Sequence, residues 1–482
     1  MIRGLLLLFF LPILSFGQNG EDVLRYSLFH ANGSARSQGM ASSMGASGGD
    51  ASGGTVNPAG LAILGKSELS ISPYYQFTDF SSEHYGQKSE TGNSNVRLGS
   101  LSLLIKLRDD ENGWNNMVFG ASISKMSDFN RNVQIEGVNN QSSLLDFFFN
   151  QVLDNQGANV DGIDSLYPFG ASLAWQTFLL DTFNNFFFTA IPDYGQVQHF
   201  ESDERGRMDQ TQFNFAVNYE HKFYFGAGLN FRSIQFTRSS DFIERVPAGD
   251  TSTFLNDYRF TEFLETTGSG VNLNVGLIYR PSPSLRFGLA YHSPTWLDLT
   301  DYWYSEMQSS FVTGQSYSAE SGDASFNYQM TTPGKITAST AIVFGKRAFV
   351  NVDMDYIDYS QAKLRWDGGQ NVFDIENDAI KANHQRAYNF RLGGEYRLSS
   401  FALRGGFSNM GNPLQGGAGG WQQLYSFGFG NRTDYVNWDF SLSYIDRVEE
   451  EFHLYEPSLA PNQASRLNMN RIQISLGLGF RI

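Results

Sequence analysis

The sequence predicts an all-β fold: a transmembrane antiparallel β-barrel of about 14 strands, with an N-terminal plug (hatch) in the lumen and a helical insertion in one extracellular loop. Composition, residue alternation and loop lengths support this prediction. Of 482 residues, 15% are aromatic and only 17% are charged, whereas soluble domains carry roughly 25% charged residues. After the N-terminal segment, no apolar run of about 20 residues follows, so membrane-spanning helices are not expected.

Most segments after Glu68 alternate between apolar and polar or small residues with the period of a β-strand. The last strand is the clearest, because apolar residues from Ile472 to Ile482 alternate with Arg, Gln, Ser and Gly. Such segments predict strands at 68–78, 96–107, 116–128, 208–221, 223–236, 268–280, 284–296, 334–344, 348–359, 386–398, 401–408, 422–430, 434–446 and 467–481.

The predicted connections alternate between short and long, as they do in outer-membrane barrels with short periplasmic turns and long extracellular loops. Short turns are expected at 221–222, 281–284, 345–347, 398–400 and 431–433. Long loops are expected at 129–207, 237–267, 297–333, 360–385 and 447–466. This alternation places both the hatch and the C-terminus on the periplasmic side.

Residues 1–17 have the features of a cleaved signal peptide: a positive Arg3, a short apolar core from Leu5 to Leu14, and small residues before Gln18. A signal peptide followed by a barrel pattern predicts the cell outer membrane. The formal charge of −15 argues against nucleic acid as a partner. The chain has no cysteine, so disulfides, thiol catalysis and cysteine-zinc sites are absent.

Residues 18–66 are expected to form the hatch, and 67–482 the barrel. The stretch from Gly39 to Gly65 is rich in Gly, Ser and Ala, almost uncharged, and without strand or helix period. It contains the turn sequence Asn57-Pro58-Ala59-Gly60, followed by apolar residues that favour burial. We therefore expect this stretch to be ordered because the barrel encloses it.

The loop at 129–207 contains two apolar stretches, Leu144–Leu153 and Leu166–Ala190, which lack strand alternation and predict one or two helices at the barrel mouth. These helices could form a lid that packs on itself. Alternatively, they could present an apolar capture surface for a hydrophobic substrate. The residues of that surface would be Phe147, Phe148, Phe169, Trp175 and Phe178.

Charged residues occur on the predicted inward faces of the strands. They could form ion pairs that brace the hatch, because charges in a lumen with little water need partners. One of the arginines could instead receive a substrate carboxylate. The residues are Arg232, Arg280, Arg286, Asp353, Asp355, Arg391, Glu395, Arg397, Arg404 and Asp439.

Other chemistries find little support. Residues 60–67 match the P-loop pattern, but a Gly/Ser run precedes them and a strand follows, so nucleotide binding is not expected. The seven histidines show no metal-ligand spacing, and no focused nucleophile–base pair predicts catalysis. We expect a non-enzyme without cofactor, metal or catalytic residues.

Three groups of residues resemble the FadL-type outer-membrane transporters of long-chain fatty acids, aromatic hydrocarbons and other hydrophobic compounds. The first is the Gly/Ser/Ala-rich N-terminus with Asp50-Ala51-Ser52 and the Asn57–Gly60 turn, and the second is Leu285–Thr295. The third comprises 333–344, 351–360, 391–396 and 403–406. The resemblance spans most of the chain and rests on the order and spacing of these motifs.

The resemblance implies a fourteen-stranded barrel, a lumenal hatch, and passive uptake of an apolar molecule that outer loops capture and that leaves sideways through the wall. Its hatch motif assigns a gating role to Asn57, Pro58 and Ala59, which we extend to Gly60 of the same turn. The expected partners are outer-membrane lipid and a hydrophobic small molecule, for a monomeric protein. Two alternatives stay open: a structural or adhesive barrel that binds a partner through its long loops, and an open diffusion porin.

Overall fold

Fourteen antiparallel strands form a closed ring in the computed structural model, as the alternation predicted. The structure describes residues 20–28, 33–107, 113–154, 162–183, 186–247, 249–366, 368, 372–417 and 422–481; the predicted signal peptide lies outside them. The ring strands are β1 (Glu68–His84), β2 (Gln87–Lys106), β3 (Trp114–Asp128), β7 (Gln196–Tyr219), β8 (Phe223–Arg245), β9 (Leu255–Ser282), β10 (Leu285–His292), β14 (Lys335–Phe344), β15 (Ala348–Asp358), β17 (Arg386–Leu398), β18 (Phe401–Met410), β19 (Gln422–Arg432), β20 (Val436–Phe452) and β21 (Ser465–Arg481).

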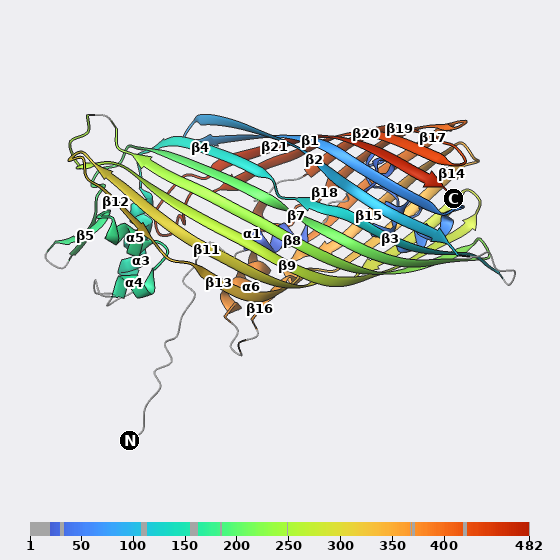
Figure 1. Ribbon diagram of the computed structural model, residues 1–482, viewed down its shortest axis with the longest axis horizontal. Helices are drawn as coiled ribbons and strands as arrows, with labels where there is room; N and C mark the ends of the chain where they lie inside the picture. Colours follow the sequence, from blue (N-terminus) through green and yellow to red (C-terminus); the bar gives the residue numbers. More distant parts are fainter. Residues whose placement is uncertain are drawn as a thin grey trace, which may run out of the picture.

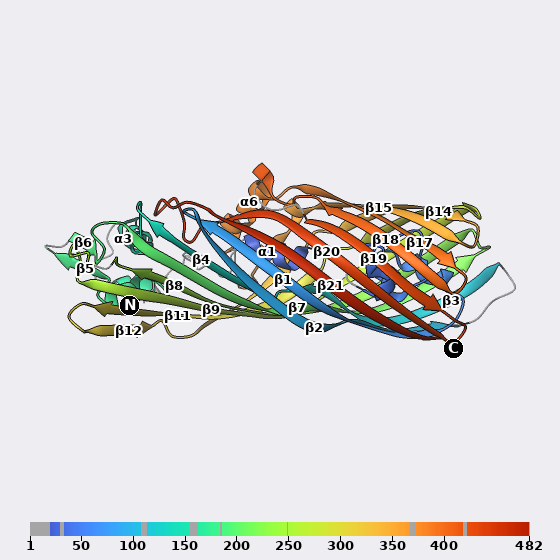
Figure 2. The same ribbon diagram turned by 90° about the horizontal axis from the view of Figure 1, so that it is seen from above.

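Each of these strands pairs with its neighbours in the ring, and β1 pairs with β21 to close it. The pairing of the first and last strands closes the ring, as a sheet inside a bilayer requires. The predicted short turns join the strands at the end where the C-terminus lies (Figures 1 and 2). Among the described helices, none has the length and apolar character to cross a bilayer.

Residues 33–64 fill the lumen near the C-terminal end of the barrel, and most of them are buried. Their turns are short: α2 (Ala35–Gln38), η1 (Ala51–Thr55) and η2 (Pro58–Ile63). The helix α1 (Gly20–Ser27) precedes this plug and lies farther toward the opposite end of the lumen (Figure 2). The expectation of a plug ordered by an enclosing barrel therefore agrees with the structure, although its boundaries at 18 and 66 stay a prediction.

The strands on one side of the barrel continue well beyond the predicted boundaries. β8 continues to Arg245 and β9 starts at Leu255, so the predicted loop at 237–267 is wrong for most of its length. Likewise, much of 297–333 and parts of 360–385 and 447–466 form strands or a helix. The additional elements are β4 (Arg131–Asn139), β11 (Trp296–Phe311), β12 (Ser316–Glu320), β13 (Ala324–Thr331), η4 (Tyr359–Gln361), β16 (Lys363–Arg365), α6 (Asp374–Asn383) and η5 (Gln415–Gly417).

The physical reason is an inversion of polarity along each long strand. In β8, the outward Phe225 and Phe231 are exposed and the inward Arg232 is buried. A few residues farther on, the inward Ile234 and Phe236 are buried, while the outward positions are polar. An outward apolar face is required only where lipid surrounds the barrel. The strand therefore continues with its hydrogen-bonded pairing beyond the point where its outward residues stop being apolar.

A lid covers the far end of the barrel and corresponds to the apolar part of the predicted long loop. Its first helix, α3 (Leu144–Asp154), agrees with the predicted one. The second apolar stretch was expected to be helical, but only part of it is. It forms α4 (Ile163–Leu166), α5 (Ala171–Gln176), and a hairpin of β5 (Leu180–Phe183) and β6 (Phe186–Thr189). The hairpin strands are rich in aromatic residues and threonine, which favour extended backbone.

Candidate functional site: the hatch, the chamber and the lid pocket

The predicted hatch motif holds the plug to itself and to the wall. Asn57 caps η2 by accepting a hydrogen bond from the Ala59 N–H at 3.1 Å. Its Nδ2 donates to the Gly45 carbonyl at 2.8 Å and to the wall carbonyl of Leu277 at 3.3 Å. Pro58 occupies the start of η2, where its missing N–H costs nothing. All four motif residues, Asn57 to Gly60, are buried.

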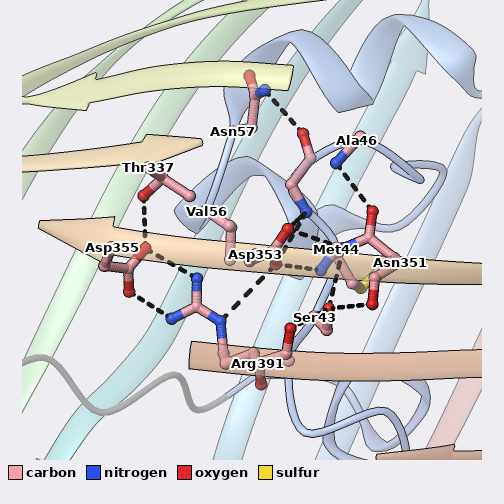
Figure 3. A network of polar contacts seen from close by, with 12 residues as sticks. Ser43, Met44, Ala46, Val56, Asn57, Thr337, Asn351, Asp353, Asp355 and Arg391 are labelled. Atoms are coloured by element: carbon pink, nitrogen blue, oxygen red, sulfur yellow. Dashed lines mark hydrogen bonds and ion pairs between the residues drawn. The ribbon is translucent and has the colours of Figure 1, made fainter. Parts of the chain in front are cut away.

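The wall supplies a carboxylate to the hatch backbone (Figure 3). Asp353 of β15 accepts hydrogen bonds from the Met44 N–H at 2.9 Å and the Gly45 N–H at 3.1 Å. Arg391 of β17 lies beside Asp353 and donates to Asp355 through two nitrogens, at 2.5 Å and 3.0 Å. These charges are buried and paired, so they can persist in a lumen with little water. This pattern matches the predicted bracing network.

A second buried cluster connects a hatch arginine to the wall. Glu395 Oε2 accepts from Arg36 Nε at 3.0 Å and from Arg404 Nε at 2.9 Å. Arg404 also pairs with Asp439 at 2.8 Å, and Arg397 donates to Glu395 at 2.7 Å. The sequence analysis missed Arg36. The signal was present, because Arg36 is a lone cation at the start of an otherwise almost uncharged Gly/Ser/Ala segment.

Glycines on the inner wall leave room for the hatch backbone. A Cβ at Gly276 would lie 1.9 Å from Asn57 Oδ1, and one at Gly226 would lie 2.4 Å from Ala59 N. Similar contacts occur around the barrel: a Cβ at Gly406 would lie 2.3 Å from the Met40 carbonyl carbon. Such distances leave no room for any larger side chain. Small residues on the wall and on the plug together allow close packing.

Above the hatch, the barrel interior is an apolar chamber that contains α1. Val23 and Tyr26 of α1 are fully buried there, and the Tyr26 and Phe129 rings meet edge to face with centroids 5.8 Å apart. The other chamber residues come from distant parts of the wall and from α6. They include Met126, Met208, Ile234, Phe236, Leu297, Tyr328, Ile357, Phe373 and Ile380.

A cavity of about 550 Å³ lies between this chamber and the lid. Of the five predicted capture residues, Phe147, Phe148 and Phe169 line it. The other two do not: Trp175 packs against the apolar core of the lid, and Phe178 is 52% exposed and contacts Tyr317. The wall adds further aromatic residues that the sequence analysis did not select, among them Phe242, Phe260, Phe263, Trp303, Tyr304 and Phe452. We call this cavity the lid pocket.

The lid pocket also contains charged side chains. Arg131, Arg238 and Arg25 line it, together with Glu204 and Glu262. Arg25 belongs to α1, pairs with Asp22 and lies over the Phe236 ring, 4.1 Å from its centroid. One residue of α1 therefore borders the lid pocket while its neighbours fill the chamber below. An aromatic cavity with a few charged groups suits an apolar molecule that has a polar end.

A buried carboxylate anchors the lid to the wall. Glu244 of β8 accepts hydrogen bonds from the Ser143 hydroxyl, from Tyr258 at 2.6 Å and from Gln198 at 2.6 Å. On α3 itself, burial raises the pKa of Asp146 above its ordinary value, although the hydrogen bond from the Ser143 N–H opposes the shift. Glu244 lay in a predicted loop, so the sequence analysis did not single it out.

The wall is incomplete between β2 and β3. The two strands pair from Lys106–Val118 to Ser100–Ser124. From there toward the extracellular end, no ladder pair joins them in the described part of the chain. β3 stays with β7, with an irregular register between Lys125 and Ser127. Beyond the last ladder pair, Arg97 and Asp128 form a long ion pair at 3.6 Å, and the Thr91 hydroxyl of β2 donates to the Asn132 carbonyl of β4 at 2.6 Å. The chamber residues Met126 and Phe129 lie on this stretch of the chain.

Comparisons with known proteins agree with this architecture. A family model described as "Outer membrane protein transport protein (OMPP1/FadL/TodX)" matches residues 28–452. A comparison with curated proteins finds no match. Three similar solved structures each cover 94% of this chain and 99% of their own. They are a Pseudomonas aeruginosa FadL homologue (TM-score 0.59, 11% identity), the P. putida toluene transporter TodX (0.55, 14%) and the CymD monoaromatic hydrocarbon channel (0.50, 13%).

The structural matches have low identity and support the fold, whereas the family model spans most of the sequence. The matched residues, 28–452, include the N-terminal plug and most of the fourteen ring strands. Members of this family are transport channels rather than enzymes. The chain belongs to the OMPP1/FadL/TodX family of outer-membrane transporters for hydrophobic compounds.

Proposed function

We propose that this protein takes up amphipathic molecules with a long apolar chain, such as long-chain fatty acids, and releases them sideways into the outer membrane. The ligand binds in the lid pocket, passes into the chamber, and leaves between β2 and β3. The single observation that carries the proposal is that the lid pocket, the chamber and the parting of β2 and β3 adjoin one another in space. α1 contacts both the pocket and the chamber, and the chamber reaches the place where the strands part.

The size and chemistry of the lid pocket favour a long amphipathic ligand. A cavity of about 550 Å³ is in the range that holds drug-sized molecules. Its aromatic walls would bury an apolar chain, and Arg131 or Arg238 could pair with an anionic end. Aromatic hydrocarbons are the second substrate class, because the similar structures include a toluene transporter and a monoaromatic hydrocarbon channel.

Sideways release follows from the packing of the hatch. Direct passage to the periplasm would require the buried Glu395 and Asp353 clusters to separate and the glycine contacts to open. An apolar ligand, in contrast, gains free energy by moving from the chamber into lipid. Breaking the single, long Arg97–Asp128 pair, in which Arg97 is 39% exposed, costs less than breaking a fully buried cluster of several charges. In this proposal, Asn57 to Gly60 hold the hatch closed.

Uptake of a radiolabelled long-chain fatty acid tests the proposal, with toluene as the competing substrate. Cells that produce the protein should accumulate the fatty acid faster than a deletion strain does. Arg131→Gln and Arg238→Gln should slow uptake of the fatty acid more than uptake of toluene. Equal rates in producing and deletion cells would refute the proposal, and preferential uptake of toluene would select the second substrate class.

Exposed aromatic residues on the lid and on the neighbouring β8–β9 connection favour one alternative function. Phe183 of the lid is 71% exposed, and Phe254, which directly precedes β9, is 74% exposed. Exposed apolar residues often mark contact sites. A structural or adhesive barrel would use these residues to bind a partner protein. Removal of residues 166–190 would then abolish partner binding and leave uptake normal.

A further inference from the structure

The outer surface of β9, β11, β13 and β16 carries polar side chains in cross-strand rows. The register places Ser269, Asp298, Gln329 and Arg365 in one row. Thr267, Thr300 and Asn327 form the next row toward the extracellular end. We call these seven residues the outer polar field. They face outward, because Leu297, Leu299 and Tyr328, which alternate with them, are buried inside the barrel.

The field borders a cavity and an aromatic side chain. A cavity of about 430 Å³ is lined by six of the seven residues and by Trp366, which follows β16. Trp366 is 37% exposed and stacks on Phe326 with the ring centroids 6.0 Å apart. Contact with Phe326 holds the indole at the rim while part of it stays accessible. An aromatic face beside hydroxyl, amide and carboxylate groups offers both apolar and hydrogen-bonding contacts.

Two cations lie at the same edge. Lys363 and Arg365 are both exposed on the outward face of β16, two residues apart. Arg365 is in the row of Gln329, and Lys363 is in the row of Thr331 below it. Arginine and lysine bind phosphate oxygens through charge-assisted hydrogen bonds. A phosphate at this edge would lie within reach of the amide and hydroxyl groups of the field, since adjacent strands are about 4.8 Å apart.

The position of the field identifies the source of such a ligand. The row below the field contains the exposed Trp296, and the strands below that row present Leu273, Leu289 and Tyr291 to lipid. Aromatic residues mark the membrane interface of outer-membrane barrels. The field therefore begins where the lipid-facing band ends. A molecule with acyl chains along the band would place its headgroup on the field.

We propose that the outer polar field, with Lys363 and Trp366, binds the phosphorylated saccharide headgroup of a glycolipid in the outer leaflet. Phosphate pairs with Lys363 and Arg365, a sugar ring lies against Trp366, and Asn327 and Gln329 contact the sugar hydroxyls. The field faces away from the lumen, so this site is separate from the uptake route. The two proposals can consequently fail independently.

Binding can be measured with the full-length protein in nanodiscs and purified lipopolysaccharide truncated to its inner core. The double variant Lys363→Ala/Arg365→Ala should lower affinity about thirtyfold, since each of the two cations near a charged lipid surface contributes about 1 kcal/mol. Trp366→Ala should lower it as well. The matched control is Lys88→Ala/Arg205→Ala, which removes two exposed cations elsewhere. Phe183→Ala controls for the loss of an exposed aromatic residue.

Three further probes define the headgroup. Dephosphorylated lipopolysaccharide should bind to the native protein as weakly as intact lipopolysaccharide binds to the double cation variant. The free inner-core oligosaccharide should bind more weakly than the lipid-linked form, and phosphatidylglycerol should not compete. Equal affinity of the field variants and their controls would overturn the proposal. So would full competition by phosphatidylglycerol, which would show nonspecific attraction to anionic lipid. Fatty-acid uptake by the double cation variant and by its matched control should stay normal.

Discussion

The two halves of the barrel share the same long strands but place opposite kinds of side chain on their inner faces. In the half that holds the hatch, apolar side chains face lipid and polar side chains face inward, as Phe231 and Arg232 illustrate. In the half that holds the chamber, Ile234 and Phe236 of the same strand face inward. The comparison shows that the polarity of the inner wall in each half matches the polarity of the segment that fills it. A polar backbone-rich plug fills one half, and apolar side chains of α1 fill the other.

The two halves also differ in how firmly their contents are held. The hatch is fixed by buried ion pairs and by backbone contacts to wall glycines. The chamber contents are held by apolar contacts, which are not directional. An apolar ligand can replace apolar contacts of α1, whereas it cannot replace the ion pair of Arg36 or the hydrogen bonds that Asp353 accepts. Movement is therefore expected in the chamber rather than in the hatch.

The largest effect is expected from filling a wall glycine. Gly276→Val would place a branched side chain where even a Cβ lies 1.9 Å from Asn57 Oδ1, so the hatch must leave its position or the barrel must fail to fold. Planar-bilayer conductance and the folded fraction on gels report the two outcomes. Gly405→Val is the control, since no atom lies within 4 Å of its Cβ position. A closed, fully folded Gly276→Val barrel would contradict the described packing.

A large effect is also expected from Glu395→Gln. This change leaves Arg36 and Arg404 buried beside a neutral group, which typically costs about 3–5 kcal/mol. Hydrogen exchange of residues 33–64 should accelerate, while that of α3 should not. Glu83→Gln, which affects an exposed pair with Lys88, serves as the control. Equal exchange in the two variants would mean that the cluster does not hold the hatch.

A moderate effect is expected in the lid pocket. Phe148→Ala removes a buried aromatic wall of the pocket and should raise the KM of fatty-acid uptake about tenfold, because burying a phenyl ring stabilises by about 1.5–3 kcal/mol. Phe178→Ala, outside the pocket and 52% exposed, should leave the KM unchanged. If the two variants behaved alike, the lid pocket would not be the capture site.

The smallest effect concerns pH and the lid. Because burial raises the pKa of Asp146, the folded lid binds this proton more tightly than the unfolded segment does. The destabilising effect of the charged form is complete above the folded pKa and disappears as the pH falls below the unfolded value. Protection of α3 from hydrogen exchange, corrected for intrinsic rates, should therefore increase from pH 7 to pH 4. Asp146→Asn should reduce this increase.

Sequence reasoning predicted the half of the barrel that lipid surrounds and did not predict the other half. Alternation around Phe225 and Ile472 is imposed by the bilayer, so the fourteen strands could be counted from it. Beyond the membrane that constraint ends, and the extensions of β8 and β9 were interpreted as loops. Asp353 and Arg391 were recognisable as inward charges. The parting of β2 and β3 was not predictable, because it depends on where hydrogen-bonded pairing ends rather than on residue type.

Joining the two parted strands covalently tests the central claim most directly. The chain has no cysteine, so Arg97→Cys with Asp128→Cys introduces a unique pair across the parting, to be linked by a short bis-maleimide. Leu101→Cys with Ile123→Cys links the same strands where they already pair. The account predicts that linking 97 to 128 stops fatty-acid uptake and that linking 101 to 123 does not. Undiminished uptake with 97 linked to 128 would contradict sideways release between β2 and β3.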